Sequence, residues 1–241
     1  MHTFLVMTNL FLFVFIGFFT NILIWPMKKL KPALQIRISN TAVRWAFWRS
    51  LFLAGAKKTV IGEKNIPDEP CLFVSNHRSN FDILLIHTST RHDLGFISKK
   101  EMNKIPFLNI QMRNIGCVFL DRDDIKSGLK TINDAAENIK KGISMCVFPE
   151  GHRSKKPDME MGEFKAGALK VAEKAGCPIV PVAVIDSDTL MEQTGKFKIV
   201  SGKAKVIFGE PIYVNQLDKQ EKRKLAANVE GKIKQMIEEY R

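Results

Sequence analysis

The N-terminal part of this chain lacks acidic side chains. No Asp or Glu precedes Glu63, although eight basic residues do, so this part carries +8 of the formal net charge of +12 and the remainder carries +4. A basic excess confined to one segment points to an anionic partner beside that segment, either a membrane surface or a nucleic acid. The basic residues are Lys28, Lys29, Lys31, Arg37, Arg44, Arg49, Lys57 and Lys58.

Cysteine is scarce, and its spacing fits neither a metal site nor a redox motif. The four residues Cys71, Cys117, Cys146 and Cys177 lie in apolar runs, with no CxxC spacing and no matching histidine cluster. They are therefore expected to be reduced core residues, as is usual in the cytoplasm. Internal repeats and low-complexity linkers are also missing, so 241 residues with 45% hydrophobic content indicate one domain plus an appendage.

One long apolar run is present, from Phe4 to Trp25. As a helix it would be about 33 Å long, enough to cross a hydrocarbon layer of about 30 Å. A cleaved secretory signal is the alternative, but no basic residues precede the run and no small-residue cleavage site follows it. We therefore expect an uncleaved anchor, either spanning the bilayer or lying in one leaflet. The lysines that follow directly place the rest of the chain on the cytoplasmic side.

The pattern of residues 33–53 predicts a second helix, which we expect to lie at the membrane interface. Arg37 and Arg44 share one face of it, and apolar side chains share another. All three tryptophans, Trp25, Trp45 and Trp48, occur in this region, and Trp favours the headgroup layer. The alternative is a soluble helical hairpin packed on the folded domain.

The rest of the chain alternates short β-rich runs with helical patterns. This predicts an α/β domain at residues 56–241, with a mostly parallel mixed sheet flanked by helices, preceded by a two-helix membrane-anchoring segment at residues 1–55. Helical spacing ends at Gly142 and at Gly176, and a C-terminal amphipathic helix places Leu225, Val229, Ile233 and Ile237 on one stripe. Strands are expected at residues 59–62, 71–75, 94–98, 115–120, 145–148, 179–185 and 203–208.

Polar residues follow four of the predicted strands. Open α/β sheets bind ligands at the carboxyl ends of their strands, so these residues are expected to share one rim. An imidazole is the side chain best suited to take a proton from a hydroxyl, and a carboxylate on its second nitrogen fixes the tautomer. Guanidinium groups bind phosphate bidentately, and glycine lets the backbone approach an anion. The residues are His77 and Asp82, then Lys99 and Lys100, then Asp121 and Arg122, then Glu150, Gly151 and Arg153.

This combination suits a substrate that bears both a phosphate and a hydroxyl. The alternative for His77 and Asp82 is structural, with Asp82 placed favourably in the first turn of a helix. A covalent serine route is disfavoured, because the segment 142–146 (Gly-Ile-Ser-Met-Cys) lacks the second glycine of a nucleophile elbow and begins a strand. The chemistry needs no metal.

Four sequence blocks, in order, resemble those of the 1-acylglycerol-3-phosphate O-acyltransferases (lysophosphatidic acid acyltransferases), a family of glycerolipid acyltransferases. The first block contains the HxxxxD pattern of His77 and Asp82. A lysine-bearing segment before Ile105-Pro106-Phe107 is also similar to the family. The blocks are residues 76–82, 116–122, 148–154 and 180–182.

The resemblance implies a glycerol-3-phosphate acyltransferase-like fold and transfer of an acyl chain from acyl-CoA or acyl-carrier protein to the sn-2 hydroxyl of 1-acylglycerol 3-phosphate. The product would be phosphatidic acid, made without a cofactor or metal on the cytoplasmic face of the inner membrane. His77 would be the general base and Asp82 its partner. The glycerol-phosphate site would be bound or shaped by Arg122, Glu150, Gly151 and Arg153, with Lys99 as a further member.

One departure from the family pattern is His152, which stands where the third block usually has threonine. This departure leaves the identity of the acceptor undecided. The alternatives to 1-acylglycerol 3-phosphate are another lysolipid, such as a lyso-ornithine lipid, and glycerol 3-phosphate. His152 could be a second catalytic histidine or a polar substitution at the rim. A non-enzymatic alternative is a basic membrane-surface module that binds lipid or nucleic acid. That alternative gives no role to His77 and Asp82, and no nucleic-acid signature is present.

Overall fold

A computed structural model of the chain describes residues 1–121, 124–157, 159–194 and 198–241. In this part of the chain the strands form one sheet in the order β1-β7-β6-β2-β5-β3-β4, with β8 paired to β6. The strands are β1 (Ala56–Ile61), β2 (Leu72–Ser75), β3 (Leu94–Lys99), β4 (Val118–Leu120), β5 (Ser144–Val147), β6 (Pro178–Ile185), β7 (Gly202–Phe208) and β8 (Ile212–Tyr213).

The sheet is mixed and mostly parallel, as predicted. Strand β2 lies between β5 and β6 and is parallel to both, while β3 is parallel to β5 and β4. The antiparallel pairs are β6 with β7 and β6 with β8, and β1 runs parallel to β7. The carboxyl ends of β6, β2, β5, β3 and β4 therefore meet at one edge of the sheet.

Each of the seven predicted strands has a counterpart, and two of them begin three residues away from the predicted start. Strand β1 begins at Ala56 because its first residues already pair with β7. Strand β4 begins only at Val118, since Gly116 adopts a positive φ of 85° in the turn that leads into it. The two-residue strand β8 was missed, because so short a pairing leaves no alternation to detect.

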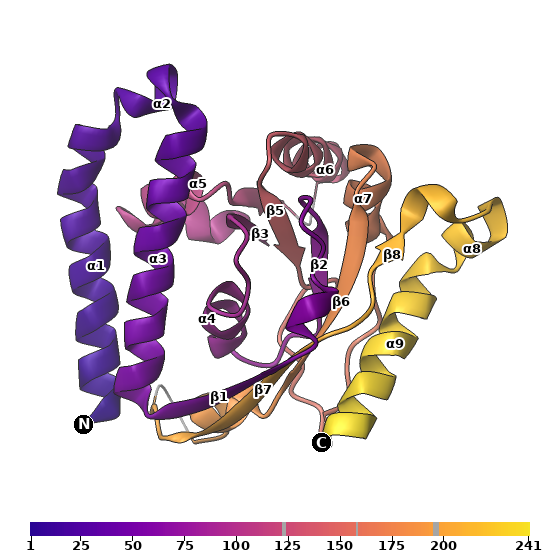
Figure 1. Ribbon diagram of the computed structural model, residues 1–241. Coiled ribbons are helices and arrows are strands. Elements are labelled where there is room, and N and C mark those ends of the chain that lie inside the picture. The colour runs from indigo at the N-terminus through magenta and orange to yellow at the C-terminus, as the bar shows by residue number, and fades with distance from the viewer. Residues whose placement is uncertain (122–123, 158, 195–197) are drawn as a thin grey trace.

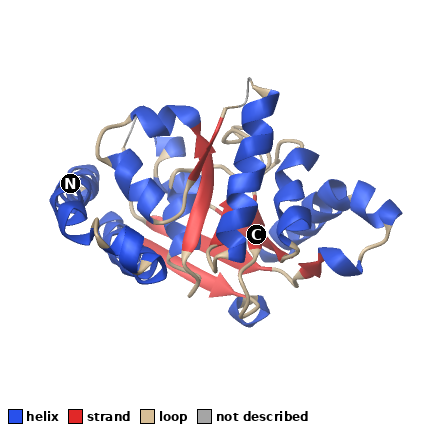
Figure 2. Cartoon of the chain, turned by 90° about the horizontal axis from the view of Figure 1, so that it is seen from above, coloured by secondary structure: helices blue, strands red, loops and turns tan. Residues whose placement is uncertain are grey.

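Helices cover both faces of the sheet (Figures 1 and 2). Phe73 of β2 points to the face covered by α3 (Pro32–Ala54) and α4 (Phe81–His87). Its neighbours Leu72 and Val74 point to the opposite face, which is covered by α6 (Ile125–Lys140), α7 (Lys170–Ala175) and α9 (Leu225–Tyr240). The shorter helices are α2 (Met27–Leu30), α5 (Leu108–Asn114) and α8 (Lys219–Arg223).

The helix ends and the C-terminal stripe agree with the sequence. Helix α6 ends two residues before Gly142, and α7 is closed by Gly176 in the left-handed region at φ 70°. The four apolar residues of the α9 stripe are all buried against the sheet. Because they alternate with charged residues at helical spacing, α9 keeps its polar side in water.

The N-terminal segment is an antiparallel hairpin of α1 (His2–Ile24) and α3, which stands beside the sheet (Figure 1). Helix α3 packs on α4, and its residues Val43, Leu51 and Ala54 belong to the core under that face. The hairpin is thus docked on the folded domain. Helix α1 is nevertheless largely exposed and, by length and composition, could cross a membrane.

Candidate active site

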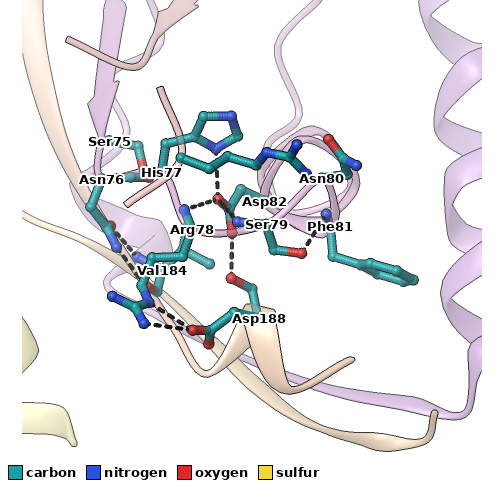
Figure 3. Close-up of polar contacts among 12 residues, drawn as sticks. Ser75, Asn76, His77, Arg78, Ser79, Asn80, Phe81, Asp82, Val184 and Asp188 are labelled. Carbon is teal, nitrogen blue, oxygen red and sulfur yellow. Dashed lines mark hydrogen bonds and ion pairs between the residues drawn. The ribbon is translucent and has the colours of Figure 1, made fainter. Parts of the chain in front are cut away.

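A histidine and a carboxylate meet where β2 gives way to α4. The His77 Nδ1 atom lies 2.8 Å from the Asp82 Oδ2 atom. The Asp82 side chain is 1% exposed and the His77 side chain is 15% exposed, so the carboxylate is sealed off while the imidazole still reaches the surface. The spacing of five residues brings the two together because the chain turns from the strand into the first turn of the helix (Figure 3).

The surroundings of Asp82 fix the tautomer of His77. The Asp82 Oδ2 atom also accepts the backbone N–H of Arg78 at 2.8 Å and of Ser79 at 2.9 Å (Figure 3). The Asp82 Oδ1 atom accepts the hydroxyl of Ser187. A carboxylate surrounded by donors acts as an acceptor, so His77 donates from Nδ1. The lone pair of Nε2 is then left for a substrate, which is the requirement for a general base.

Glu150 positions the backbone of the same turn. Its Oε1 atom accepts the backbone N–H of His77 at 2.7 Å, and its Oε2 atom accepts that of Gly162 at 2.6 Å. Burial raises the pKa of Glu150 above its usual value, and the two N–H donors offset only part of that rise. Both carboxylate oxygens are thus taken by main-chain groups. We therefore place Glu150 as a residue that shapes the site from behind, at the end of β5.

Two further contacts hold His77 in place. Its ring stacks on Phe148, with 4.0 Å between centroids and 18° between planes, and its carbonyl accepts the N–H of Ser154 at 2.7 Å. Just before it, Asn76 exchanges two hydrogen bonds of 2.8 Å with the backbone of Val184 in β6 (Figure 3). The turn that carries His77 and Asp82, residues 76–82, is called the catalytic turn below. The third block and β6 therefore support it from two sides.

The predicted phosphate-binding residues lie in different surroundings. Arg153 is on the loop after β5, 42% exposed, and donates to Glu192 at 3.0 Å. Gly151 adopts a positive φ of 79° in the same loop, which a glycine tolerates without strain. Lys99 is exposed at the end of β3. Arg122 lies outside the described residues.

Sequence reasoning missed the loop that follows β6. Ser187 binds Asp82, and Asp188 forms a buried ion pair with Arg78, whose Nη2 atom lies 2.7 Å from the carboxylate. Glu192 accepts from Arg153, from the Ser79 hydroxyl and from the Asn80 backbone N–H. The signal was available, because these residues follow a parallel strand at the same edge of the sheet.

The rim is hollowed beyond β3 and β4. A pocket of about 350 Å³ there is lined by Lys100, Arg113 and Lys130 among other residues. Lys100 pairs with Asp121 at 2.7 Å. Asp121 and Asp134 also line the pocket, so it carries charges of both signs.

Other nucleophiles and metal ligands are poorly placed in the described part of the chain. The four cysteines are free and buried, and burial raises the pKa of each thiol, to about 12 for Cys117 and about 11 for Cys177. Thiols of this kind are poor nucleophiles at neutral pH. Among the described residues, no group of three or more His, Cys, Asp and Glu side chains is arranged to hold a metal ion.

A partly exposed histidine, held by a sealed carboxylate at the ligand-binding edge of an open α/β sheet, is typical of the class of enzymes that remove a proton from a bound substrate. Comparison with known proteins narrows this class. Residues 57–185 match the family model described as Acyltransferase, which covers more than half of the chain and includes the whole catalytic turn. The chain belongs to this acyltransferase family.

Relatives with assigned names agree with one another. A protein of Mycoplasma pneumoniae named probable 1-acyl-sn-glycerol-3-phosphate acyltransferase is 34% identical over 79% of this chain and 74% of its own length. A chloroplastic 1-acyl-sn-glycerol-3-phosphate acyltransferase of Brassica napus is 37% identical over 71% of this chain and 50% of its own length.

A solved structure supports the fold along the whole chain. The crystal structure of the 1-acyl-sn-glycerophosphate (LPA) acyltransferase PlsC from Thermotoga maritima matches with a TM-score of 0.81 and 26% identity. The match covers 100% of this chain and 96% of that one. The N-terminal hairpin therefore belongs to the shared architecture as well as the α/β sheet.

Proposed function

We propose that this protein transfers an acyl chain from a thioester donor to the sn-2 hydroxyl of 1-acylglycerol 3-phosphate, giving phosphatidic acid. The observation that carries the proposal is the 2.8 Å contact of His77 with buried Asp82, inside the segment that matches the acyltransferase family. The acceptor is supported by relatives that are named for this reaction.

The proposed step needs one base and an activated acyl group. His77 takes the proton of the hydroxyl at Nε2 as the oxygen attacks the thioester carbonyl carbon, and Asp82 stabilises the imidazolium that forms. Collapse of the tetrahedral intermediate breaks the C–S bond, and the proton passes from His77 to the departing thiolate. No cofactor is required, because the thioester supplies the activated acyl group.

The glycerol-phosphate end of the acceptor would lie along the rim. Arg153 and Lys99 are exposed cations at the ends of β5 and β3, and Gly151 lets the loop approach an anion. Arg122 completes the set by its place in the second block. Glu150 contributes indirectly, by fixing the backbone of His77.

The N-terminal hairpin associates with a membrane, where a lysophospholipid is found. Trp25, Trp45 and Trp48 are each more than half exposed, and the apolar face of α1 is open along its length. We propose that residues 1–55 anchor the α/β domain, residues 56–241, on the cytoplasmic face of the inner membrane. The acyl donor would then be acyl-CoA or acyl-carrier protein arriving from the cytoplasm.

A matrix of donors and acceptors tests this function. Membranes containing the protein are supplied with labelled acyl-CoA or acyl-carrier protein, and with lysophosphatidic acid, lyso-ornithine lipid or glycerol 3-phosphate. We expect phosphatidic acid as the main product, with lysophosphatidic acid the preferred acceptor. Preferred acylation of either other acceptor contradicts the assignment, and lipid binding without transfer favours the non-enzymatic membrane module.

Two substitutions test whether Arg153 binds the phosphate of the acceptor. Arg153→Ala is expected to raise the KM for lysophosphatidic acid about tenfold or more, since a hydrogen bond to a charged group is lost. Lys155→Ala is the matched control, because Lys155 is an exposed cation two residues away. Equal effects of the two substitutions would mean that Arg153 acts only through general surface charge.

A further inference from the structure

The carboxylate of Glu192 is the anion that the catalytic turn currently binds. Its Oε1 atom lies 3.0 Å from the Arg153 guanidinium and 3.0 Å from the Asn80 backbone nitrogen, and its Oε2 atom accepts the hydroxyl of Ser79. Ser79 and Asn80 lie between His77 and Asp82 in the sequence. A negative charge from a different loop is thus held on the turn that joins His77 to Asp82.

The segment that carries Glu192 is firmly rooted. Ser187 donates to Asp82, and Asp188 pairs with Arg78, with both side chains of this pair less than a tenth exposed. The amide of Gln193 donates to the same Asp188 carboxylate at 3.0 Å. Side chains before Glu192 therefore tie this loop to the catalytic turn, and Gln193 ties the residue after it to Asp188. The Glu192 carboxylate can then be exchanged by rotation of its own side chain.

The two ion pairs of this loop differ in their exposure. The Arg78–Asp188 pair is sealed, and opening it would leave an uncompensated buried charge, which is costly. The Arg153–Glu192 pair is 42% and 21% exposed, and a pair that open contributes little to stability. A phosphate has more charge and more acceptor oxygens than a carboxylate, so it can displace Glu192 from Arg153.

We propose that Glu192 occupies the place of the acceptor phosphate when no acceptor is bound, and that lysophosphatidic acid binds by replacing it on Arg153 and Ser79. This proposal rests on the proposed function, since it takes the phosphate-bearing acceptor from there. Glu192 then acts as a specificity-determining residue. An anionic headgroup must outcompete it, whereas a neutral headgroup cannot displace it.

The proposal predicts that removing the charge of Glu192 strengthens acceptor binding. In Glu192→Gln, the KM for lysophosphatidic acid in mixed micelles is expected to fall about two- to fivefold, the range that corresponds to a partly exposed ion pair, with a smaller change in kcat. Glu192→Ala should act in the same direction. Glu173→Gln is the matched control, because it removes the same charge from an exposed position on α7.

A binding measurement separates this proposal from the reaction itself. Glycerol 3-phosphate serves as a soluble headgroup probe and glycerol as its neutral counterpart, with the shift in melting temperature as the readout. The probe should stabilise Glu192→Gln more than wild type, and glycerol should not distinguish the two proteins. Tighter binding of the probe in a protein that does not acylate lysophosphatidic acid would retain the exchange and reject the proposed function.

The opposite result would overturn the exchange. If Glu192 only holds Arg153 in a productive position, Glu192→Gln and Glu192→Ala raise the KM and weaken binding of glycerol 3-phosphate. Unchanged KM and unchanged probe binding in both variants would equally reject it, since a competing anion cannot be removed without effect.

Discussion

The two ends of helix α4 carry the same kinds of side chain in opposite surroundings. At its start, Asp82 holds His77, whose ring remains 15% exposed. At its end, His87 is fully buried under α3, where its Nε2 atom lies 3.1 Å from the amide oxygen of Asn40. Its Nδ1 atom has no hydrogen-bond partner among the described residues. One imidazole is therefore open to the surface, and the other is closed off from it.

The surroundings of each histidine set its role. Burial, together with the nearby Arg44 guanidinium, lowers the pKa of His87 to about 3. Arg44 itself is tied to the backbone, donating to the carbonyl of His92 at 2.6 Å. His87 is thus a neutral packing residue between the hairpin and the sheet. Substitutions at the first end should alter catalysis, and those at the second should alter stability.

The largest expected effect is on catalysis at the first end of α4. Asp82→Asn removes the charge that stabilises the imidazolium of His77, and an amide can also hold the ring in the wrong tautomer. We expect kcat to fall about 100- to 10,000-fold, the usual contribution of general acid–base catalysis. Steady-state acyl transfer to lysophosphatidic acid measures it. A fall of less than threefold would mean that Asp82 serves only to cap the helix.

The second expected effect is on acid stability at the other end of α4. Because the folded-state pKa of His87 is lowered from 6.5 to about 3, the unfolded state binds more protons between these pH values. The contribution of neutral His87 to the free energy of unfolding is therefore complete above pH 6.5. It is lost as the pH falls toward 3, by about a few kcal/mol in all.

Replacement of His87 tests this assignment. His87→Gln retains a donor for Asn40 and does not titrate. Its unfolding free energy, measured by denaturant titration, should therefore fall less between pH 6.5 and pH 4 than that of wild type. Acyl transfer at neutral pH should be retained. A parallel fall in both proteins would show that other groups carry the acid sensitivity.

An intermediate effect is expected from the residue behind the catalytic turn. Glu150→Gln leaves one of two backbone N–H groups, that of His77 or that of Gly162, without an acceptor. We expect kcat to fall about tenfold, with a smaller change in KM, because the base is displaced while the rim is kept. A change in KM alone would instead assign Glu150 to acceptor binding.

The smallest effect concerns the ring under His77. Phe148→Leu removes the stacked contact at 4.0 Å but keeps an apolar side chain. Aromatic pairs of this kind contribute about 0.5–1.5 kcal/mol, so kcat should fall only a few-fold. Phe164→Leu is the control, since Phe164 is a buried aromatic residue packed against the other face of the sheet. It should lower the melting temperature with little effect on kcat.

The contacts of the candidate site at the start of α4 were only partly predictable from the sequence. His77 and Asp82 are five residues apart across a strand-to-helix junction, so local geometry alone brings them together. Glu192 meets Arg153 across 39 residues, through a loop whose path depends on where β6 lies in the sheet. Such a contact depends on tertiary packing, which leaves no periodic signal in the chain.

Glu150 shows a second limit of the sequence. The third block predicted that it binds or shapes the glycerol-phosphate site, but a motif does not reveal which way a carboxylate faces. In the structure its oxygens face two backbone amides, whereas Arg153 and Lys99 are exposed at the same edge of the sheet. The fold was easier to predict, because strand alternation and glycine-terminated helices are properties of local sequence.

The most direct test of the central claim is kcat for His77→Ala, measured beside its unfolding free energy and beside His152→Ala. His152 is exposed and lies on the same rim, so its loss controls for removal of a nearby imidazole. The account predicts loss of acyl transfer to lysophosphatidic acid in His77→Ala, with lipid binding and stability kept, and activity retained in His152→Ala. Full activity of a folded His77→Ala protein would contradict it.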